Sequence, residues 1–275
     1  MIVHELLAET VPSYRENRLA AEAATREAIN DGRAMLTAGE LTTLPVVVHV
    51  VYRTDEENVS DEQVASQIDA LNRDFGAANE DRSQVPGVWT SLVGDANIEF
   101  TLDDTTRTKT DVESFGPDDA VKSPDTGGIA PVAGKLNLWC CSLGQSLLGY
   151  AQFPGGPPET DGVVILNTAF GTTGTVQEPF HLGRTAVHEV GHWLGLRHIW
   201  GDINDCTGDD FVADTPKAQQ ANTGKPKFPH VTCNNGPNGD MFMNYMDYTD
   251  DDAMFMFTVG QIARMNATLT GPRAQ

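Results

Sequence analysis

The segment from His188 to His198, HEVGHWLGLRH, constrains the fold of this chain more than any other feature. His188 and His192 stand four residues apart, and residues at that spacing share one face of an α-helix. Gly195 can adopt the left-handed conformation that ends a helix, so the chain can turn and bring His198 to the same point. The segment therefore predicts a helix, a sharp turn and three converging imidazoles.

This histidine pattern predicts a catalytic metal site. Three neutral imidazoles leave one tetrahedral position of a zinc ion open, which is typical of catalytic rather than structural zinc. Glu189 flanks the same point and is placed to act as general base on a zinc-bound water, whose pKa the metal lowers to roughly 7. A helix with an ordinary core histidine and a surface carboxylate is the alternative. It requires five positions of HExxHxxGxxH to agree by chance.

A second element is the segment MNYMDY, residues 243–248, which lies about fifty residues beyond the histidines. A methionine turn beneath three imidazoles supplies a soft apolar floor. Tyr248 can place its phenol near the oxyanion formed during hydrolysis. Ordinary core packing is the alternative for both, and the neighbouring histidine pattern favours the functional interpretation.

Charge and cysteine usage narrow the class of protein. The net charge of -21, from 39 acidic and 18 basic side chains, argues against nucleic acid and anionic membranes as partners. No apolar run reaches membrane-spanning length, and the N-terminal residues lack the pattern of a signal peptide. Cys206 and Cys233 lie in loop-like sequence and can form a disulfide, whereas at least one of Cys140 and Cys141 is expected in the core.

The pattern of apolar residues predicts an α/β fold. A polar helix is expected over about residues 14–36, and Ser60 with Gln63 predicts a capping box at the start of another. A final helix is expected to begin near Thr258, with Gln261 at capping-box distance. Strands are predicted at residues 46–52, 98–102, 136–141, 147–153 and 162–166. This order indicates a helix layer on a twisted, mixed sheet.

With these motifs, the chain resembles the metzincin clan of metalloendopeptidases, and within it the ulilysin-like members of the pappalysin family. The matching stretches cover most of residues 44–265. They are LPVVVHVVY, LNLWCCSLG, LLGYAQFPGG, DGVVILNTAFG, GRTAVHEVGHWLGLRHIWGD, DDFVADTP and NGDMFMNYMDYTDDDAMFMFTVGQIARM.

The resemblance implies a domain organisation. Residues 1–42 resemble the rear of a pro-segment, and residues 43–275 form a catalytic domain. Its upper part, about 43–195, carries a twisted, mixed five-stranded sheet and the active-site helix. Its irregular lower part, about 196–275, carries the Met-turn and the last helix.

The resemblance also implies roles for individual residues. The zinc ligands are His188, His192 and His198, the general base is Glu189, the Met-turn methionine is Met246, and the tyrosine after it is Tyr248. The strand near residues 148–153 matches the edge strand that binds extended substrate by adding a β-strand. Relatives of this type prefer cleavage before Arg or Lys, with an acidic residue after the Met-turn lining the primed-side pocket. Asp252 is the expected residue among Asp250, Asp251 and Asp252, and a solvated acidic turn is the alternative.

Calcium near the cleft is a further implication of the resemblance. Clustered carboxylates with loop carbonyls suit a hard cation with several oxygen ligands. The candidates are Asp202, Asp205, Asp209, Asp210, Asp214 and Thr215, of which Asp209, Asp210, Asp214 and Thr215 form the expected ligand set. A charged loop without an ion is the alternative.

The chain departs from the family in its cysteines. Lys225 and Ala253 stand where the family has a second disulfide, which leaves Cys206–Cys233 as the expected bridge. No cysteine precedes Cys140, so the pro-segment cysteine that blocks zinc in family zymogens is missing. The resemblance implies secretion as a zymogen, with the signal peptide absent from this chain. We expect a monomer that acts on proteins or peptides.

Two other classes of function compete with a peptidase. A binding module that keeps the fold and metal without catalysis is one, and the intact Glu189 argues against it. A hydrolase acting on a non-peptide bond is the other, and the peptide-accepting edge strand makes it the weaker alternative.

Overall fold

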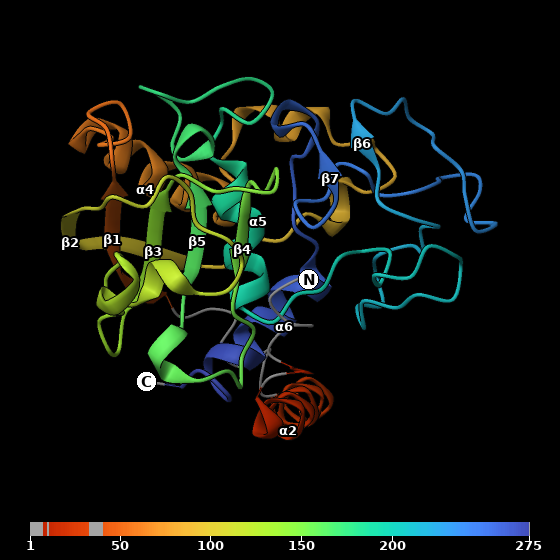
Figure 1. Cartoon of the computed structure of the whole chain (residues 1–275). Helices are drawn as coiled ribbons and strands as arrows, with labels where there is room; N and C mark the ends of the chain where they lie inside the picture. Colours follow the sequence, from red (N-terminus) through yellow and green to blue (C-terminus); the bar gives the residue numbers. More distant parts are fainter. Residues whose placement is uncertain (1–7, 10, 33–40, 275) are drawn as a thin grey trace.

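The computed structural model describes residues 8–9, 11–32 and 41–274, and its centre is a five-stranded sheet (Figure 1). The strands are β1 (Thr42–Tyr52), β2 (Ile98–Lys109), β3 (Leu136–Cys141), β4 (Gly149–Ala151) and β5 (Val163–Leu166). Their order is β2-β1-β3-β5-β4, with β4 antiparallel and the others parallel. The predicted mixed sheet is confirmed, although β2 is longer and β4 shorter than expected.

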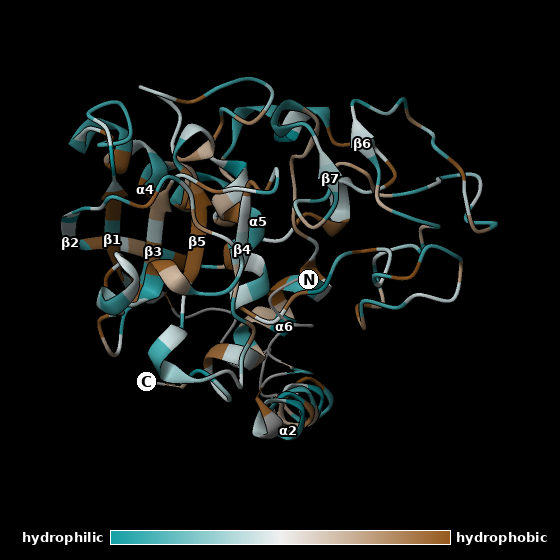
Figure 2. Ribbon diagram, in the orientation of Figure 1, coloured by the Kyte–Doolittle hydropathy of each residue, from teal (hydrophilic) through white to brown (hydrophobic). Residues whose placement is uncertain are grey.

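The central strands of the sheet, β1, β3 and β5, are buried on both faces, to which their successive side chains point in turn. Val46, Val48 and Val50 of β1 belong to the larger apolar cluster. Val51 belongs to a second cluster on the other face, together with Trp139 of β3. Both Cys140 and Cys141 are buried and unpaired. Figure 2 shows hydrophobic residues along β1 and β5, as expected for strands covered on both sides.

Two helices cover the face of the larger cluster, α4 (Asp61–Phe75) and α5 (Arg184–Trp193). Ser60 Oγ accepts a hydrogen bond from the main-chain N–H of Gln63, as predicted. The reciprocal hydrogen bond, from the Ser60 main-chain N–H to the Gln63 side chain, is not formed at this helix end. The Gln63 amide instead donates to the carbonyls of Asn167 and Phe170, which lie close enough to satisfy it in the interior.

The chain after residue 195 has little regular structure until its last helix. β6 (Thr223–Gly224) and β7 (Tyr248–Thr249) pair in parallel, and α6 (Val259–Leu269) follows. Thr258 and Gln261 form both halves of the predicted capping box. A disulfide joins Cys206 to Cys233. The short 3-10 helices are η1 (Glu80–Gln84), η2 (Thr90–Leu92), η3 (Ala120–Lys122), η4 (Pro124–Thr126), η5 (Pro158–Thr160), η6 (Asn167–Ala169) and η7 (Asp251–Ala253).

The N-terminal helix α2 (Pro12–Asn30) packs against α6 below the sheet (Figure 1). Glu22 of α2 pairs with the buried Arg264 of α6. Arg18 lies 4.4 Å from the centre of the Phe153 ring. The predicted helix is confirmed over this range, and its expected end at residues 33–36 lies outside the described residues. No helix in the described part of the chain is long and apolar enough to span a membrane.

Candidate active site

Three imidazoles converge where α5 ends. His188 and His192 project from one face of the helix, and Gly195, with φ of +89°, turns the chain so that His198 returns to them. The Nε2 atom of His198 lies 3.2 Å from that of His188 and 3.0 Å from that of His192. Within the described residues, these three form the only group of at least three His, Cys, Asp or Glu side chains close enough to share a metal ion.

The hydrogen bonds of the three rings fix which nitrogen carries a proton. The Nδ1 atom of His188 lies 2.7 Å from the Tyr245 carbonyl, and that of His192 lies 2.9 Å from the Leu196 carbonyl. The Nδ1 atom of His198 lies 2.5 Å from a carboxylate oxygen of Asp202. All three partners accept hydrogen bonds, so each Nδ1 is the donor and each Nε2 presents a lone pair.

Three lone pairs at this separation repel one another unless a cation lies between them. Zinc–nitrogen bonds of about 2.0–2.1 Å in tetrahedral geometry place ligand nitrogens roughly 3.3 Å apart, near the separations found here. Burial lowers the pKa of His188 to about 4 and holds the pKa values of His192 and His198 well below the usual range. The rings are therefore neutral at neutral pH, and the residues fit a zinc ion.

Glu189 lies beside the cluster and is buried. It packs against Gly149 of the edge strand β4, where a Cβ atom would come within 3.0 Å of the Glu189 Cγ. Burial raises the pKa of Glu189 to about 7. A cation among the imidazoles would favour the ionised carboxylate and lower this pKa.

The residues of the predicted Met-turn lie beneath and beside the imidazoles. Met246 is fully buried, and a Cβ atom on Gly191 of α5 would come within 2.6 Å of its sulfur, so this glycine allows the close approach. The ring centre of Tyr248 lies 4.7 Å from that of His198 and 4.8 Å from that of Trp200. Tyr248 is 45% exposed, yet desolvation of its phenol and then the nearby charge of Glu189 raise the pKa of the phenol above its usual range, so it is a hydrogen-bond donor at neutral pH.

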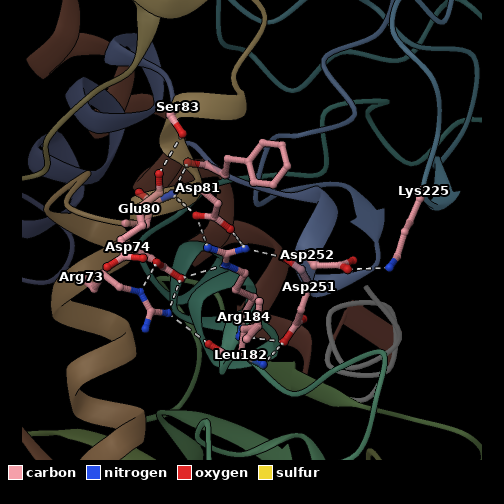
Figure 3. A network of polar contacts seen from close by, with 12 residues as sticks. Arg73, Asp74, Glu80, Asp81, Ser83, Leu182, Arg184, Lys225, Asp251 and Asp252 are labelled. Carbon is pink, nitrogen blue, oxygen red and sulfur yellow. Dashed lines mark hydrogen bonds and ion pairs between the residues drawn. The ribbon is translucent and has the colours of Figure 1, made fainter.

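Glu189 and Tyr248 line a cavity of about 350 Å³. Its acidic lining is Asp247 and Asp251, together with Glu189. Asp252, the expected pocket residue, is not among the lining residues. Its carboxylate lies 2.5 Å from the Lys225 ammonium (Figure 3). The Lys225 side chain is 60% exposed and that of Asp252 43%.

Arg184, the first residue of α5, is a further lining residue that was not singled out from the sequence. Its buried guanidinium lies 3.2 Å from Asp74 and 2.6 Å from Asp81, and it donates to the main-chain carbonyl of Asp251 (Figure 3). The only signal in the sequence is a basic residue just before the histidine motif, and its partners lie too far away in sequence to be found there.

The expected calcium ligands do not converge. Asp210 Oδ2 accepts a hydrogen bond of 2.7 Å from Thr215, and both residues are buried. Asp214 instead accepts from the Thr258 hydroxyl and the Gly260 N–H, at the start of α6. Asp209 is half-exposed and accepts from the N–H two residues on. The structure brings together Asp210 and Thr215 only.

Known proteins resemble the chain over most of its length. A family model described as pregnancy-associated plasma protein-A, the pappalysin peptidases, matches residues 144–270. An extracellular metalloprotease of Arthroderma benhamiae is 31% identical across 90% of this chain and 82% of its own length. One from Pyricularia oryzae is 32% identical, across 84% of this chain and 76% of its own length.

Solved structures agree with these sequence relatives. Mature mirolysin of Tannerella forsythia, in complex with a cleaved peptide, is 48% identical with a TM-score of 0.80, over 82% of this chain and 90% of that chain. A mutant of promirolysin from the same organism is 43% identical with a TM-score of 0.86, over 98% of this chain and 93% of that chain. These similarities and the three-histidine cluster show that the chain belongs to the pappalysin family of metzincin metalloendopeptidases, enzymes that use zinc to cleave peptide bonds.

Proposed function

We propose that this metalloendopeptidase uses His188, His192 and His198 as zinc ligands and Glu189 as general base, and that it prefers Arg or Lys after the scissile bond. The observation that carries the catalytic part is the convergence of three Nε2 lone pairs beside a buried carboxylate that lines an open cavity.

Each of these groups has a separate role in the proposed hydrolysis of a peptide bond. When bound, zinc supplies a Lewis acid that polarises the scissile carbonyl and acidifies water. Glu189 takes a proton from the attacking water and passes it to the leaving amine. The phenolic hydroxyl of Tyr248 donates a hydrogen bond to the developing oxyanion. The free edge of β4, next to the cavity, holds an extended substrate through main-chain hydrogen bonds.

The catalytic proposal is tested by Glu189→Gln, which keeps the size of the side chain and removes its basicity. We expect hydrolysis of casein or a labelled peptide to fall by about 10²–10⁴-fold, with zinc content unchanged. Glu159→Gln, at an exposed site in η5, is the matched control and should retain full activity. Undiminished hydrolysis by the Glu189 variant would exclude this mechanism. Zinc binding with no hydrolysis by the wild type would favour a binding module.

The specificity proposal rests on the carboxylates of the lower region. Asp251 lines the cavity. Asp252 lies in the same short helix, η7, and its carboxylate forms an ion pair with the Lys225 ammonium. We expect peptides with Arg or Lys after the scissile bond to be cleaved faster than matched peptides with Glu there, and Asp252→Asn to narrow this difference. Equal rates for basic and acidic peptides would contradict the proposal.

A structural calcium ion is proposed at Asp210 and Thr215. Burial raises the pKa of Asp210 to about 7, so its carboxylate lies in an environment that lacks sufficient compensating charge. A calcium ion would supply this charge and stabilise the ionised form. We expect calcium to raise the melting temperature of the wild type and not that of Asp210→Asn. A similar rise in both proteins would place the ion elsewhere.

Secretion and activation by removal of residues 1–42 are also proposed, with residues 43–195 and 196–275 as upper and lower parts of a monomeric catalytic domain. The sequence relatives are named extracellular metalloproteases, and promirolysin resembles the chain over nearly its whole length. N-terminal sequencing after incubation of the full chain should show cleavage near residue 42 together with a rise in activity. An active full-length chain that stays intact would contradict this activation, and size-exclusion chromatography tests the monomer.

A further inference from the structure

The three histidines are not held in the same way. His188 and His192 lie on α5, and their Nδ1–H groups donate to main-chain carbonyls. His198 lies on irregular chain beyond the helix, and its Nδ1–H donates to the carboxylate of Asp202 at 2.5 Å. The third histidine is therefore the one whose orientation depends on another side chain.

The local backbone is shaped to bring Asp202 to this ring. Gly201 and Asp202 both have positive φ, of +68° and +61°, so the chain doubles back after Trp200. The Trp200 ring stacks on the His198 ring at 4.2 Å with an angle of 6° between the planes. Stacking fixes the plane of the imidazole, but it leaves open which nitrogen faces the other two histidines. The carboxylate selects Nδ1 as the donor and leaves Nε2 to face the cluster.

The carboxylate also changes the electronic character of the ligand. A negative charge that accepts the Nδ1–H increases the basicity of Nε2, and hence its strength as a metal ligand. The carbonyl partners of the two other rings are uncharged. Asp202 thus contributes a charge that the helix-borne ligands lack.

We propose that Asp202 is a positioning residue for zinc: it orients His198, fixes its tautomer and strengthens its bond to the metal. This inference rests on the proposed function only in that zinc occupies the three-histidine cluster. Its role was hidden in the sequence among the acidic residues that suggested a calcium loop.

Two variants separate the contributions of Asp202. Asp202→Gly removes the carboxylate and tolerates the positive φ without strain. Asp202→Asn also tolerates it, and its amide oxygen can still accept the hydrogen bond without the charge. Asp205→Asn changes an exposed carboxylate of the same loop, which accepts hydrogen bonds from Thr207, and is the matched control.

The measurement is the zinc dissociation constant of each full-length protein, obtained by competition with a chromophoric chelator. We expect Asp202→Gly to bind zinc about 10–100-fold more weakly, Asp202→Asn to lie between it and the wild type, and Asp205→Asn to match the wild type. A constant for Asp202→Gly within twofold of the wild type would overturn the inference.

The result is distinguishable from failure of the proposed function. A wild type that binds no zinc at this cluster would refute the proposed zinc site itself. A wild type that binds zinc tightly, with unchanged affinity in Asp202→Gly, would refute the role of Asp202 alone. Should the glycine variant fail to fold by circular dichroism, the asparagine variant still decides, because an affinity equal to that of the wild type would contradict a role for the charge.

Discussion

The active site has two differently built sides, which we call the upper side, made of α5 and the sheet, and the lower side, made of the chain after Gly195. On the upper side, His188, Glu189 and His192 lie on α5, a helix packed on a sheet whose central strands are buried on both faces. On the lower side, His198 lies on irregular chain, and Tyr248 begins β7, a strand of two residues. The upper groups are fixed by the helix period, whereas the lower groups lie on irregular chain that depends on individual polar contacts as well as on the apolar cluster that both sides share.

The polar contacts of the lower side are nevertheless dense and buried. Asn244 and Gln261 exchange two hydrogen bonds, and the Asn244 side chain also accepts from the N–H of Met246. Asp247 accepts from the main chain and side chain of Asn222. Such networks specify one conformation of an irregular chain, and each depends on particular partners. Single polar substitutions should therefore act more strongly below the cleft than on the surface above it.

The largest effect is expected at Arg184, which joins the two sides. Its guanidinium links α5 to Asp74 and Asp81 and to the main chain of Asp251 (Figure 3). Arg184→Met should lower the free energy of unfolding by about 3–5 kcal/mol, because it leaves the buried Asp74 and the partly buried Asp81 without their shared cation. Urea unfolding of the metal-free protein measures this change.

A neighbouring arginine supplies the control. Arg73 also pairs with Asp74, at 2.9 Å, but its side chain is partly exposed and does not reach the lower side. Arg73→Met should cost about 1 kcal/mol or less. Equal losses in the two variants would show that Arg184 does not join the two sides.

The second effect tests how far the lower side depends on its disulfide. Replacing both Cys206 and Cys233 by serine opens a loop with a sequence separation of 27 residues. We expect a loss of about 2–4 kcal/mol, because the unfolded chain regains its freedom. Hydrogen exchange should rise between residues 206 and 233 while α5 stays protected. Increased exchange spread evenly over α5 would contradict the division into two sides.

The upper side is the more predictable from sequence because its helices and strands leave regular patterns of apolar residues. The bounds of β3 follow from a run that is apolar except for Asn137, and the end of α5 follows from Gly195. The second half of β2 was missed because its polar, exposed residues pair only with β1 at the edge of the sheet. The second half of the capping box at Ser60 failed because Gln63 found buried carbonyls more than a hundred residues away in sequence.

Below the cleft, residue types suggested functions but not partners. The acidic residues from Asp202 to Asp214 suggested one calcium loop, yet Asp202 contacts His198 and Asp214 contacts the start of α6. Both contacts depend on turns with positive φ or on distant elements, which no local pattern encodes. The histidine site could be predicted from sequence because the helix period fixes the spacing of its first two ligands.

The third effect is the pH dependence of the calcium-free lower side. Burial raises the pKa of Asp210 to about 7 from its ordinary 3.8, so between these values the folded state holds a proton that the unfolded state has lost. Stability should therefore fall as pH rises from about 4 to about 7, because the unfolded state binds fewer protons. One pKa unit corresponds to about 1.4 kcal/mol, and we expect a contribution of at least this size.

Unfolding in a chelating buffer at pH 5 and pH 8 measures this contribution. Asp210→Asn should be less sensitive to pH than the wild type. Asp209→Asn, at the half-exposed neighbouring site, should keep most of the pH dependence, because burial is a larger cause of the raised pKa of Asp210 than the Asp209 charge. An identical pH slope in the wild type and Asp210→Asn would show that the buried carboxylate does not control the stability of the lower side.

The smallest effect on stability is expected at Lys225, where specificity should change instead. Its ion pair with Asp252 is exposed to solvent, so Lys225→Met should leave the melting temperature within about 2 °C of the wild type. Without the Lys225 ammonium, Asp252 would attract a basic substrate side chain more strongly. The kcat/KM for peptides with Arg after the scissile bond, divided by that for peptides with Leu there, should therefore rise about two- to fivefold. Lys227→Met, on the same loop, is the control and should keep the wild-type ratio. A ratio unchanged by Lys225→Met would mean that Asp252 does not sense the substrate, and would leave Asp251 as the acidic residue that a basic side chain meets in the cavity.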